Sequence, residues 1–258
     1  MNPDEIASCC ATAYQHDAVA LILGDSYHPG GLDLTRRLAA ALGFKGGERV
    51  LDIASGPGTT AFCFASEFGV TVDGVDLGDQ TVAAANAAAA ELGFADRVSF
   101  RVSDVERLPF GDASVDAVVC ECAFCLFPDK KGAAREMARV LRPGGRVGIT
   151  DVTLDPERLN PELASLAGWV ACIADARPVA TYAQLLESAG LRVTLTERHD
   201  QALARMIEMI DARLAAFAML DAPAFRGIDI DTVRAKVAVA AKAVRDGVAG
   251  YSLLVAQK

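Results

Sequence analysis

A glycine-rich turn is the first segment whose residues could do chemistry. Leu51–Thr59 reads LDIASGPGT and connects an expected strand to an expected helix. Gly56 and Gly58 permit a sharp turn and a close approach of a ligand to the backbone, and the next helix offers free N–H groups there. A dinucleotide site would have three glycines in this place, so by itself the turn is also compatible with a plain structural connection.

Three acidic residues sharpen this interpretation. Asp76 ends the second expected strand, about twenty residues after the glycines, where a carboxylate can accept both hydroxyls of a ribose. Asp104 ends the third expected strand, where a carboxylate can meet an adenine amino group, and Asp52 lies next to the turn. Each acid alone could be a helix cap or a solvated turn residue. The three together predict a nucleoside-containing ligand at the carboxyl ends of the strands.

Cysteines form the second group of residues with chemical potential. Cys120, Cys122 and Cys125 lie in CECAFC after the fourth expected strand, and Cys172 lies in GWVACIADARP. Free cysteines can be small core residues. A zinc site would need well-spaced pairs and histidine, which His16, His28 and His199 do not supply. The third interpretation is that soft thiolates bind a soft ion or metalloid.

The elements that must position these residues alternate from residue 49 onward. Short β-branched segments and segments with helical spacing predict a parallel, doubly wound sheet with right-handed crossovers. The expected strands are Arg49–Ala54, Val70–Asp76, Val98–Asp104, Val115–Cys122, Arg146–Val152, Leu191–Arg198 and Gly250–Lys258. The expected helices are Leu32–Leu42, Thr60–Phe68, Ala83–Gly93, Lys131–Leu141, Tyr182–Ala189, 201–219 and 231–244.

We interpret residues 1–258 as a single Rossmann-like α/β domain. A helical cap comprises residues 1–44, a cofactor-binding core residues 45–198, a helical insertion residues 199–249 and a closing strand residues 250–258. A separate C-terminal domain is disfavoured, because residues 199–258 alone offer one strand and two helices.

Five segments in this order resemble the motifs of class I S-adenosylmethionine-dependent methyltransferases. They are DIASGPGT, GVDL (Gly74–Leu77), SDVERLPF (Ser103–Phe110), VDAVVCE and EMARVLRPGGRV (Glu136–Val147), and the resemblance covers roughly residues 45–200. It implies a seven-stranded sheet of order 3-2-1-4-5-7-6 whose last strand is antiparallel. It also implies an enzyme with S-adenosylmethionine as cofactor, lying across the strand ends.

The resemblance also assigns roles to individual residues. Asp52 and the backbone of Gly56 and Gly58 face the methionine moiety, Asp76 holds the ribose, Asp104 and Val105 flank the adenine, and Cys120 lies near the sulfonium. We also expect cofactor contacts from Ala54, Ser55 and Leu77, which adjoin these residues. Independently of the resemblance, Tyr27 in the loop before the first core helix is expected to stack over the site.

Within this class, the sequence is most similar to the arsenite methyltransferase and UbiE-like small-molecule branch. The segments are VVCECAFCLFPDKK, Asp151–Val152 and WVACIADARPVATYAQLLESAGL. The resemblance implies that Cys122 and Cys172, with Cys125 nearby, hold trivalent arsenic as substrate, with a reducing thiol as co-reactant and no metal cofactor. The cysteine that this branch carries just before the first strand has no counterpart, since Cys9 and Cys10 lie well ahead of that place.

Two other functions remain open at this point. One is C- or O-methylation of a small organic metabolite, where a hydroxyl acceptor would need a base. The candidates for that base are His28 in the DSYHPGG loop and Glu121. The other is a non-catalytic module that binds S-adenosylmethionine or senses a metalloid.

Composition argues against several partner classes. The net charge of -9 disfavours nonspecific attraction to nucleic acid, and the fourth strand lacks the Asn/Asp-Pro-Pro-aromatic signature of amino-methylating enzymes. No apolar run reaches the roughly 18 residues of a membrane span. The N-terminus has no basic region typical of a signal peptide, and seven cysteines are an odd number. We therefore expect a cytoplasmic protein with thiols, a small-molecule substrate, and neither nucleic-acid partner nor membrane span.

Overall fold

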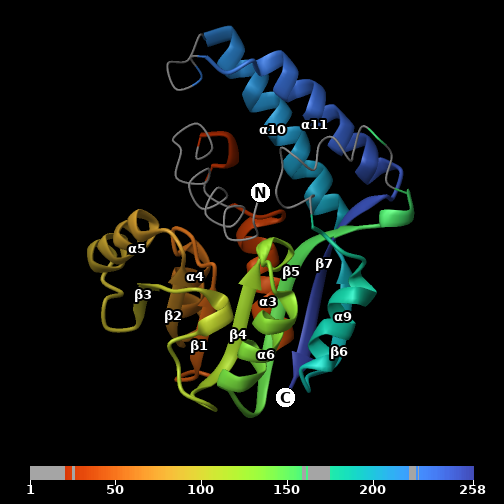
Figure 1. The fold of residues 1–258 in the computed structure, drawn as a ribbon. Helices are drawn as coiled ribbons and strands as arrows, with labels where there is room; N and C mark the ends of the chain where they lie inside the picture. The colour runs from red at the N-terminus through yellow and green to blue at the C-terminus, as the bar shows by residue number, and fades with distance from the viewer. Residues whose placement is uncertain (1–20, 25–26, 159–160, 162–174, 221–224, 226) are drawn as a thin grey trace.

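A computed structural model describes residues 21–24, 27–158, 161, 175–220, 225 and 227–258, and all statements below concern these residues. Seven strands form one sheet in the order β3-β2-β1-β4-β5-β7-β6 (Figure 1). The last strand runs antiparallel to both of its neighbours, and the other neighbouring pairs are parallel. The expected Rossmann-like order and the antiparallel closing strand are confirmed. The strands are β1 (Arg49–Ile53), β2 (Thr71–Asp76), β3 (Val98–Val102), β4 (Val115–Glu121), β5 (Leu141–Leu154), β6 (Arg192–Arg198) and β7 (Ala249–Gln257).

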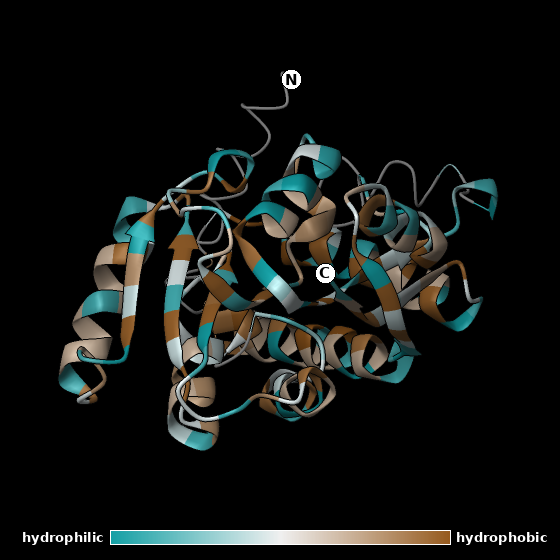
Figure 2. Ribbon diagram, turned by 90° about the horizontal axis from the view of Figure 1, so that it is seen from below, coloured by the Kyte–Doolittle hydropathy of each residue, from teal (hydrophilic) through white to brown (hydrophobic). Residues whose placement is uncertain are grey.

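Helices cover both faces of this sheet. One face carries α3 (Gly31–Leu42), α4 (Thr59–Phe68) and α5 (Asp79–Glu91), and the other carries α6 (Lys130–Val140) and α9 (Val179–Ser188). Short 3₁₀ turns follow three strands: η1 (Val105–Arg107), η2 (Phe124–Leu126) and η3 (Pro156–Arg158). Parallel strands that are enclosed on both faces are apolar where they cross the core. Ala117 to Cys120 of the central strand β4 are all fully buried, whereas β3 at the edge of the sheet has exposed residues. In Figure 2, brown segments of the strands are interrupted by white and teal ones.

Two elements begin at least four residues before their expected first residue, and the others start within three residues of theirs. Helix α5 begins at Asp79 rather than Ala83, because the chain already turns helical after Gly78 and Asp79 supplies an acidic first turn. Strand β5 begins at Leu141 rather than Arg146. The Pro-Gly-Gly segment between these residues shifts the register between β4 and β5, so that Leu141 pairs with Val115 while Arg146 pairs with Ala117. The sequence signal for a turn therefore corresponds to an irregularity inside a longer strand.

A pair of long helices connects β6 to β7. Helices α10 (Asp200–Leu220) and α11 (Ile230–Arg245) pack against each other and form a small second core around Leu214 and Phe225. Leu154 at the end of β5 pairs with Ala249 at the start of β7, so the helix pair rejoins the sheet at its carboxyl edge. Figure 1 shows the pair rising beyond that edge. None of the described helices has the length and apolar character to cross a membrane.

Two expected features lie largely outside the described residues. The N-terminal helical cap is described only from Leu21, and Cys9, Cys10 and His16 precede it. Cys172 also lies outside the described residues, in the segment that follows η3.

Candidate functional site

The glycine-rich turn leaves open space in front of Gly56. Ala54 and Gly56 both adopt positive φ angles, of 56° and 52°, at the carboxyl end of β1. A Cβ built on Gly56 would meet no atom within 4 Å, so the backbone here is accessible to a ligand. Gly58 has a different reason to be glycine, because its Cβ would lie 2.4 Å from the Phe100 ring. Gly58 also adopts a positive φ of 86°, so both its backbone conformation and its packing against Phe100 favour glycine, and its contact with a cofactor stays a prediction.

Asp76 ties the turn to the end of β2. Its Oδ2 accepts a hydrogen bond from the Gly56 N–H at 2.9 Å, and its Oδ1 accepts one from the Gly78 N–H at 2.9 Å. The Ser55 N–H also donates to the Val75 carbonyl at 3.0 Å. Hydrogen bonds to a carboxylate are stronger than neutral ones, so this acid and the turn hold each other in place.

Asp52 and Ser55 carry buried polar atoms that have no hydrogen-bond partner: Oδ2 of Asp52 and Oγ of Ser55. Burial raises the pKa of Asp52 well above its usual range, and the charges of Glu121 and Asp76 raise it further. Such orphaned atoms are rare in folded proteins. Their position beside the open face of Gly56 fits a ligand that donates hydrogen bonds or carries positive charge.

The neighbouring strand ends present exposed apolar side chains. Leu77 follows Asp76 and is 47% exposed, and Val102 at the end of β3 is 54% exposed. Asp104 is exposed as well, and its Oδ1 caps η1 by accepting from the Glu106 N–H at 2.9 Å. Val105 is instead buried, with 7% exposure. An apolar surface beside two carboxylates is suited to a flat, polar-edged ring such as adenine.

Val102 is a residue that the sequence did not single out. It pairs with Asp76 across the sheet and is exposed although it is β-branched and ends a strand. Its position in the sequence, two residues before Asp104 at the end of the third expected strand, could have marked it as a candidate contact.

Glu121, at the end of β4, is the centre of a buried polar cluster. Its Oε2 accepts from Thr60 Oγ1 at 2.7 Å and from Thr35 Oγ1 at 3.0 Å, and its Oε1 lies 3.4 Å from Thr150 Oγ1. The His28 Nε2 lies 3.5 Å from Oε2, and the Glu121 side chain is only 4% exposed. The structure thus brings together the two residues considered as a base, from the loop before α3 and from β4.

The loop that carries His28 is held by its own contacts. The Nδ1 of His28 lies 3.3 Å from the Pro29 carbonyl oxygen, and its Nε2 lies 3.3 Å from Thr35 Oγ1. Tyr27, expected to stack over the cofactor, is partly buried, and burial raises its pKa. The stacking role of Tyr27 stays a prediction.

The cysteines after β4 differ sharply in accessibility. Cys120 and Cys125 are fully buried, whereas Cys122 is half-buried and adopts a positive φ of 56°. Burial, with the charges of Asp151 and Asp52, raises the pKa of the Cys120 thiol and so disfavours its thiolate. The Cys125 N–H donates to Asp151 Oδ2 at 2.8 Å. Cys122 is therefore the thiol of CECAFC best placed to meet a substrate.

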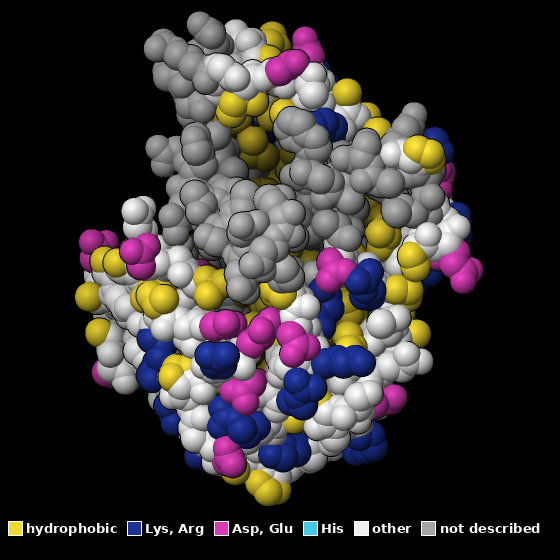
Figure 3. All heavy atoms as spheres, in the orientation of Figure 1, with side chains coloured by type: hydrophobic (Ala, Val, Ile, Leu, Met, Phe, Trp, Pro, Cys, Tyr) yellow, Lys and Arg dark blue, Asp and Glu magenta, His cyan; other side chains and the backbone are white. Residues whose placement is uncertain are grey.

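No metal site is apparent in the described part of the chain. Nowhere in it do three or more His, Cys, Asp or Glu side chains gather in an arrangement that could hold a metal ion. On the face shown in Figure 3, basic and acidic side chains are intermixed rather than gathered by sign.

Comparison with known proteins finds a methyltransferase domain in part of the chain. Residues 50–145 match the family model described as "Methyltransferase domain". Across 123 residues the chain is 40% identical to 27-O-demethylrifamycin SV methyltransferase of Amycolatopsis mediterranei, covering 48% of this chain and 45% of that protein. Across 149 residues it is 37% identical to the arsenite methyltransferase of Halobacterium salinarum, covering 56% and 37%. The chain thus spans less than half the length of these two curated relatives.

Solved structures show the same fold. Phosphoethanolamine N-methyltransferase 2 of Haemonchus contortus, in complex with S-adenosyl-L-methionine, superimposes with a TM-score of 0.83 at 22% identity, covering 98% of this chain and 60% of that one. The [4+2]-cyclase SpnF superimposes with a TM-score of 0.80 at 23% identity, covering 98% and 96%. These likenesses concern the fold alone, and the cyclase illustrates that the fold hosts more than one chemistry.

Residues 50–145 thus match a methyltransferase domain, and the strand order is the one that the resemblance to the class I S-adenosylmethionine-dependent methyltransferases implies. S-adenosylmethionine is the methyl donor of this class. The residues at the carboxyl edge fit that cofactor: the Gly56 backbone is open, Asp52 and Ser55 have orphaned polar atoms, and Leu77 and Val102 form an exposed apolar surface.

Proposed function

We propose that this protein transfers a methyl group from S-adenosylmethionine to a small-molecule acceptor. The observation that carries the proposal is the Asp76 carboxylate, which bridges the Gly56 and Gly78 N–H groups beside the orphaned Oδ2 of Asp52. In this arrangement Asp76 holds the ribose, Asp104 faces the adenine edge, and Asp52 with Ser55 faces the methionine end. When bound, the cofactor supplies an electrophilic methyl group on a sulfonium. The chain contributes alignment and exclusion of water.

The first experiment measures S-adenosylhomocysteine release by purified protein with a panel of acceptors, after S-adenosylhomocysteine binding has been established by calorimetry. The panel contains arsenite with a reducing thiol, phenols and catechols, primary and secondary amines, and carbon acids. Acceptor-dependent release supports the proposal. Binding without release for any acceptor would instead favour a cofactor-binding or metalloid-sensing module.

A thiophilic acceptor such as trivalent arsenic is our first proposal for the substrate. Its support is the half-buried Cys122 at the end of β4 and the 37% identity to an arsenite methyltransferase. Soft thiolates bind soft metalloids, and a nucleophile with a free lone pair needs no base. Cys122 and Cys172 would hold the substrate, and Cys125, which is fully buried, would act as their neighbour rather than as an exposed ligand.

The test of this substrate is Cys122→Ser, with Cys63→Ser as the matched control. Cys63 lies in α4 and belongs to no proposed site. Arsenite-dependent release should fall by at least about 100-fold in Cys122→Ser, while S-adenosylhomocysteine affinity stays within about twofold. Full arsenite turnover in Cys122→Ser, or equal losses in both variants, would contradict the proposal.

An organic acceptor that loses a proton is a second candidate, favoured by one specific observation. Glu121 and His28 lie 3.5 Å apart in a buried cluster at the end of β4, next to Cys122. Three threonine hydroxyls surround the Glu121 carboxylate. Among the described residues, His28 is the only basic side chain whose nitrogen lies within 4 Å of it. A carboxylate–histidine pair is a common device for taking a proton from a hydroxyl. The curated relative that acts on 27-O-demethylrifamycin SV shows that such acceptors occur among similar proteins.

A further inference from the structure

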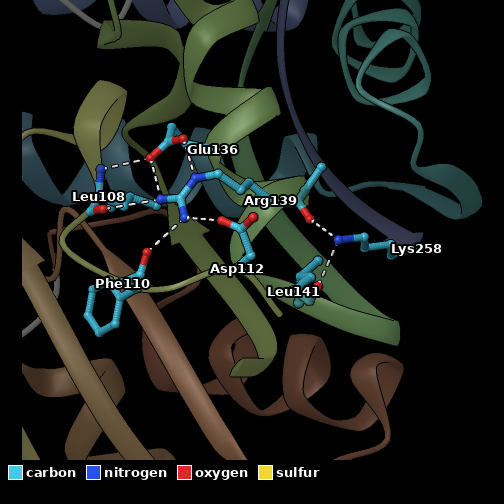
Figure 4. A network of polar contacts seen from close by, with 8 residues as sticks. Leu108, Phe110, Asp112, Glu136, Arg139, Leu141 and Lys258 are labelled. Carbon is cyan, nitrogen blue, oxygen red and sulfur yellow. Dashed lines mark hydrogen bonds and ion pairs between the residues drawn. The ribbon is translucent and has the colours of Figure 1, made fainter. Parts of the chain in front are cut away.

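An arginine of α6 holds the loop after β3 through every nitrogen of its side chain. Arg139 Nη1 donates to the Phe110 carbonyl at 2.8 Å and to Asp112 at 2.8 Å, and Nη2 donates to the Leu108 carbonyl at 3.2 Å (Figure 4). Its Nε and Nη2 also form a two-point contact with Glu136, at 2.6 and 2.7 Å. The planar fork of five donors is fully engaged, which a lysine could not reproduce.

Glu136 completes the hold on the same loop. Its Oε2 accepts from the Leu108 N–H at 2.9 Å. Glu136 and Arg139 together therefore hydrogen-bond both the N–H and the carbonyl group of Leu108. Arg139 is 31% exposed and Glu136 19%, so the pair is partly shielded from water. The contact with Arg139 lowers the pKa of Glu136, which keeps the carboxylate charged.

The loop held in this way is the one that carries the proposed adenine contacts. Asp104 and Val105 lie four and three residues before Leu108. On the other side, the Ser103 N–H donates to the Asp76 carbonyl at 2.9 Å, and the Glu106 carboxylate accepts from the Asp129 N–H at 2.8 Å. The turn η1 is thus suspended between the end of β2 and helix α6.

We propose that Arg139 and Glu136 are positioning residues that set the place of Asp104 and Val105 and thereby the recognition of the adenine ring. The inference rests on the proposed function, because it assumes that the adenosine moiety lies at this strand end. Neither residue touches the ligand. They act by fixing Leu108, so that the Asp104 carboxylate meets the exocyclic amino group without first ordering a loop.

The test compares the dissociation constants of S-adenosylhomocysteine and S-inosylhomocysteine. In the inosine compound an oxo group, with a proton on N1, replaces the exocyclic amino group from which Asp104 would accept a hydrogen bond. A carboxylate hydrogen bond of this kind predicts a preference for the adenosine compound of about 10- to 100-fold in the wild type. Arg139→Gln and the milder Arg139→Lys should reduce that preference to about threefold or less. Arg142→Gln, which breaks a surface ion pair with Asp116, is the matched control and should keep it.

The ratio separates positioning from a purely structural role. A variant that is only destabilised would show a lower melting temperature with an unchanged ratio, and that result would overturn the inference. Asp104→Ala should abolish the preference by itself, and adding Arg139→Gln to it should then change the ratio no further. An additional loss of preference in the double variant would also overturn it. If the wild type binds neither compound, that result contradicts the proposed function itself and is distinguishable from a failure of the positioning role.

Discussion

Polar groups are held differently in two halves of the carboxyl edge of the sheet. We call the ends of β1, β2 and β3, where we propose that the cofactor binds, the cofactor half, and the ends of β4 and β5, where we propose that the acceptor binds, the acceptor half. In the cofactor half, carboxylates bind backbone N–H groups: Asp76 binds Gly56 and Gly78, and Asp104 binds Glu106. In the acceptor half, Asp151 also binds backbone N–H groups, but Glu121 is held by side chains from elements far apart in the chain.

This difference has a physical basis in what each half must do. A cofactor of constant shape is served by backbone groups, whose position follows from the strand–turn–helix connection itself. An acceptor requires side chains that differ from protein to protein, and these are supplied by loops and helices outside the repeating pattern. The predictions below test whether the two halves act independently.

The largest effect should follow Asp76→Ala. The substitution removes the acceptor for the Gly56 and Gly78 N–H groups and for the ribose, so the affinity for S-adenosylhomocysteine should fall by about 1000-fold. Isothermal titration calorimetry measures this loss. Asp79→Ala, at an exposed position in the first turn of α5, is the control and should bind normally. If the affinity for S-adenosylhomocysteine falls by less than about tenfold in Asp76→Ala, the proposed role of Asp76 in holding the ribose is wrong.

Glu121→Gln should affect the acceptor half alone. For an acceptor that loses a proton, kcat should fall by about 100-fold, because the amide keeps the shape of the cluster but cannot accept the proton. The affinity for S-adenosylhomocysteine should stay within about twofold of the wild type. Steady-state kinetics with the most active acceptor of the panel measures the first quantity, and calorimetry the second.

The control for this variant is Glu91→Gln, at an exposed position near the end of α5. Unchanged kcat in Glu121→Gln would leave the cluster with a structural role and favour the thiophilic acceptor. A parallel loss of cofactor affinity would break the comparison, because the two halves would then share this residue.

The smallest effect concerns stability and its pH dependence. The raised pKa of Asp52 means that the fold prefers the protonated carboxyl, so this residue destabilises the unliganded protein increasingly as pH rises above about 4, the usual pKa of an unfolded Asp. Asp52→Asn is neutral at every pH. Its melting temperature should exceed that of the wild type by at least about 2 °C at pH 7, and the advantage should vanish near pH 4.

Thermal scans without ligand at both pH values measure this advantage. Asp96→Asn, an exposed position between α5 and β3, is the control and should show no pH-dependent gain. An equal gain at both pH values would mean that the buried charge is not the cause. The same Asp52→Asn variant should bind S-adenosylhomocysteine more weakly, which would tie the instability to cofactor binding.

Sequence patterns predicted the seven-stranded sheet closely. The order 3-2-1-4-5-7-6 was implied by the resemblance, and the structure confirms it. The largest errors in the predicted element bounds concern strand β5 and helix α5, where the local residue types did not mark the first residue. Strand β5 includes the Pro-Gly-Gly segment, because the neighbouring strand pairs with Leu141 on one side of it and Arg146 on the other. Helix α5 begins before the alanine run that marked it in the sequence.

The sequence by itself located the residues of the proposed cofactor site, because Asp52, Gly56, Asp76 and Asp104 each stand at or next to a strand end that can be recognised from local periodicity. The tertiary structure decided the rest. Only the folded protein packs Phe100 against Gly58 and leaves Val102 exposed. It also buries Cys120 and Cys125 fully and leaves Cys122 half-buried.

The tertiary structure also assembled the polar cluster around Glu121 and the contacts of the Arg139–Glu136 pair with the loop after β3. The contacts that Glu121, Glu136 and Arg139 make there join residues from 27 to 93 positions apart, except within the helical Arg139–Glu136 pair itself. Such contacts depend on how crossover helices and loops pack onto the sheet. No periodicity or spacing along the chain records that packing, because side chains meet across the sheet only after the elements have docked.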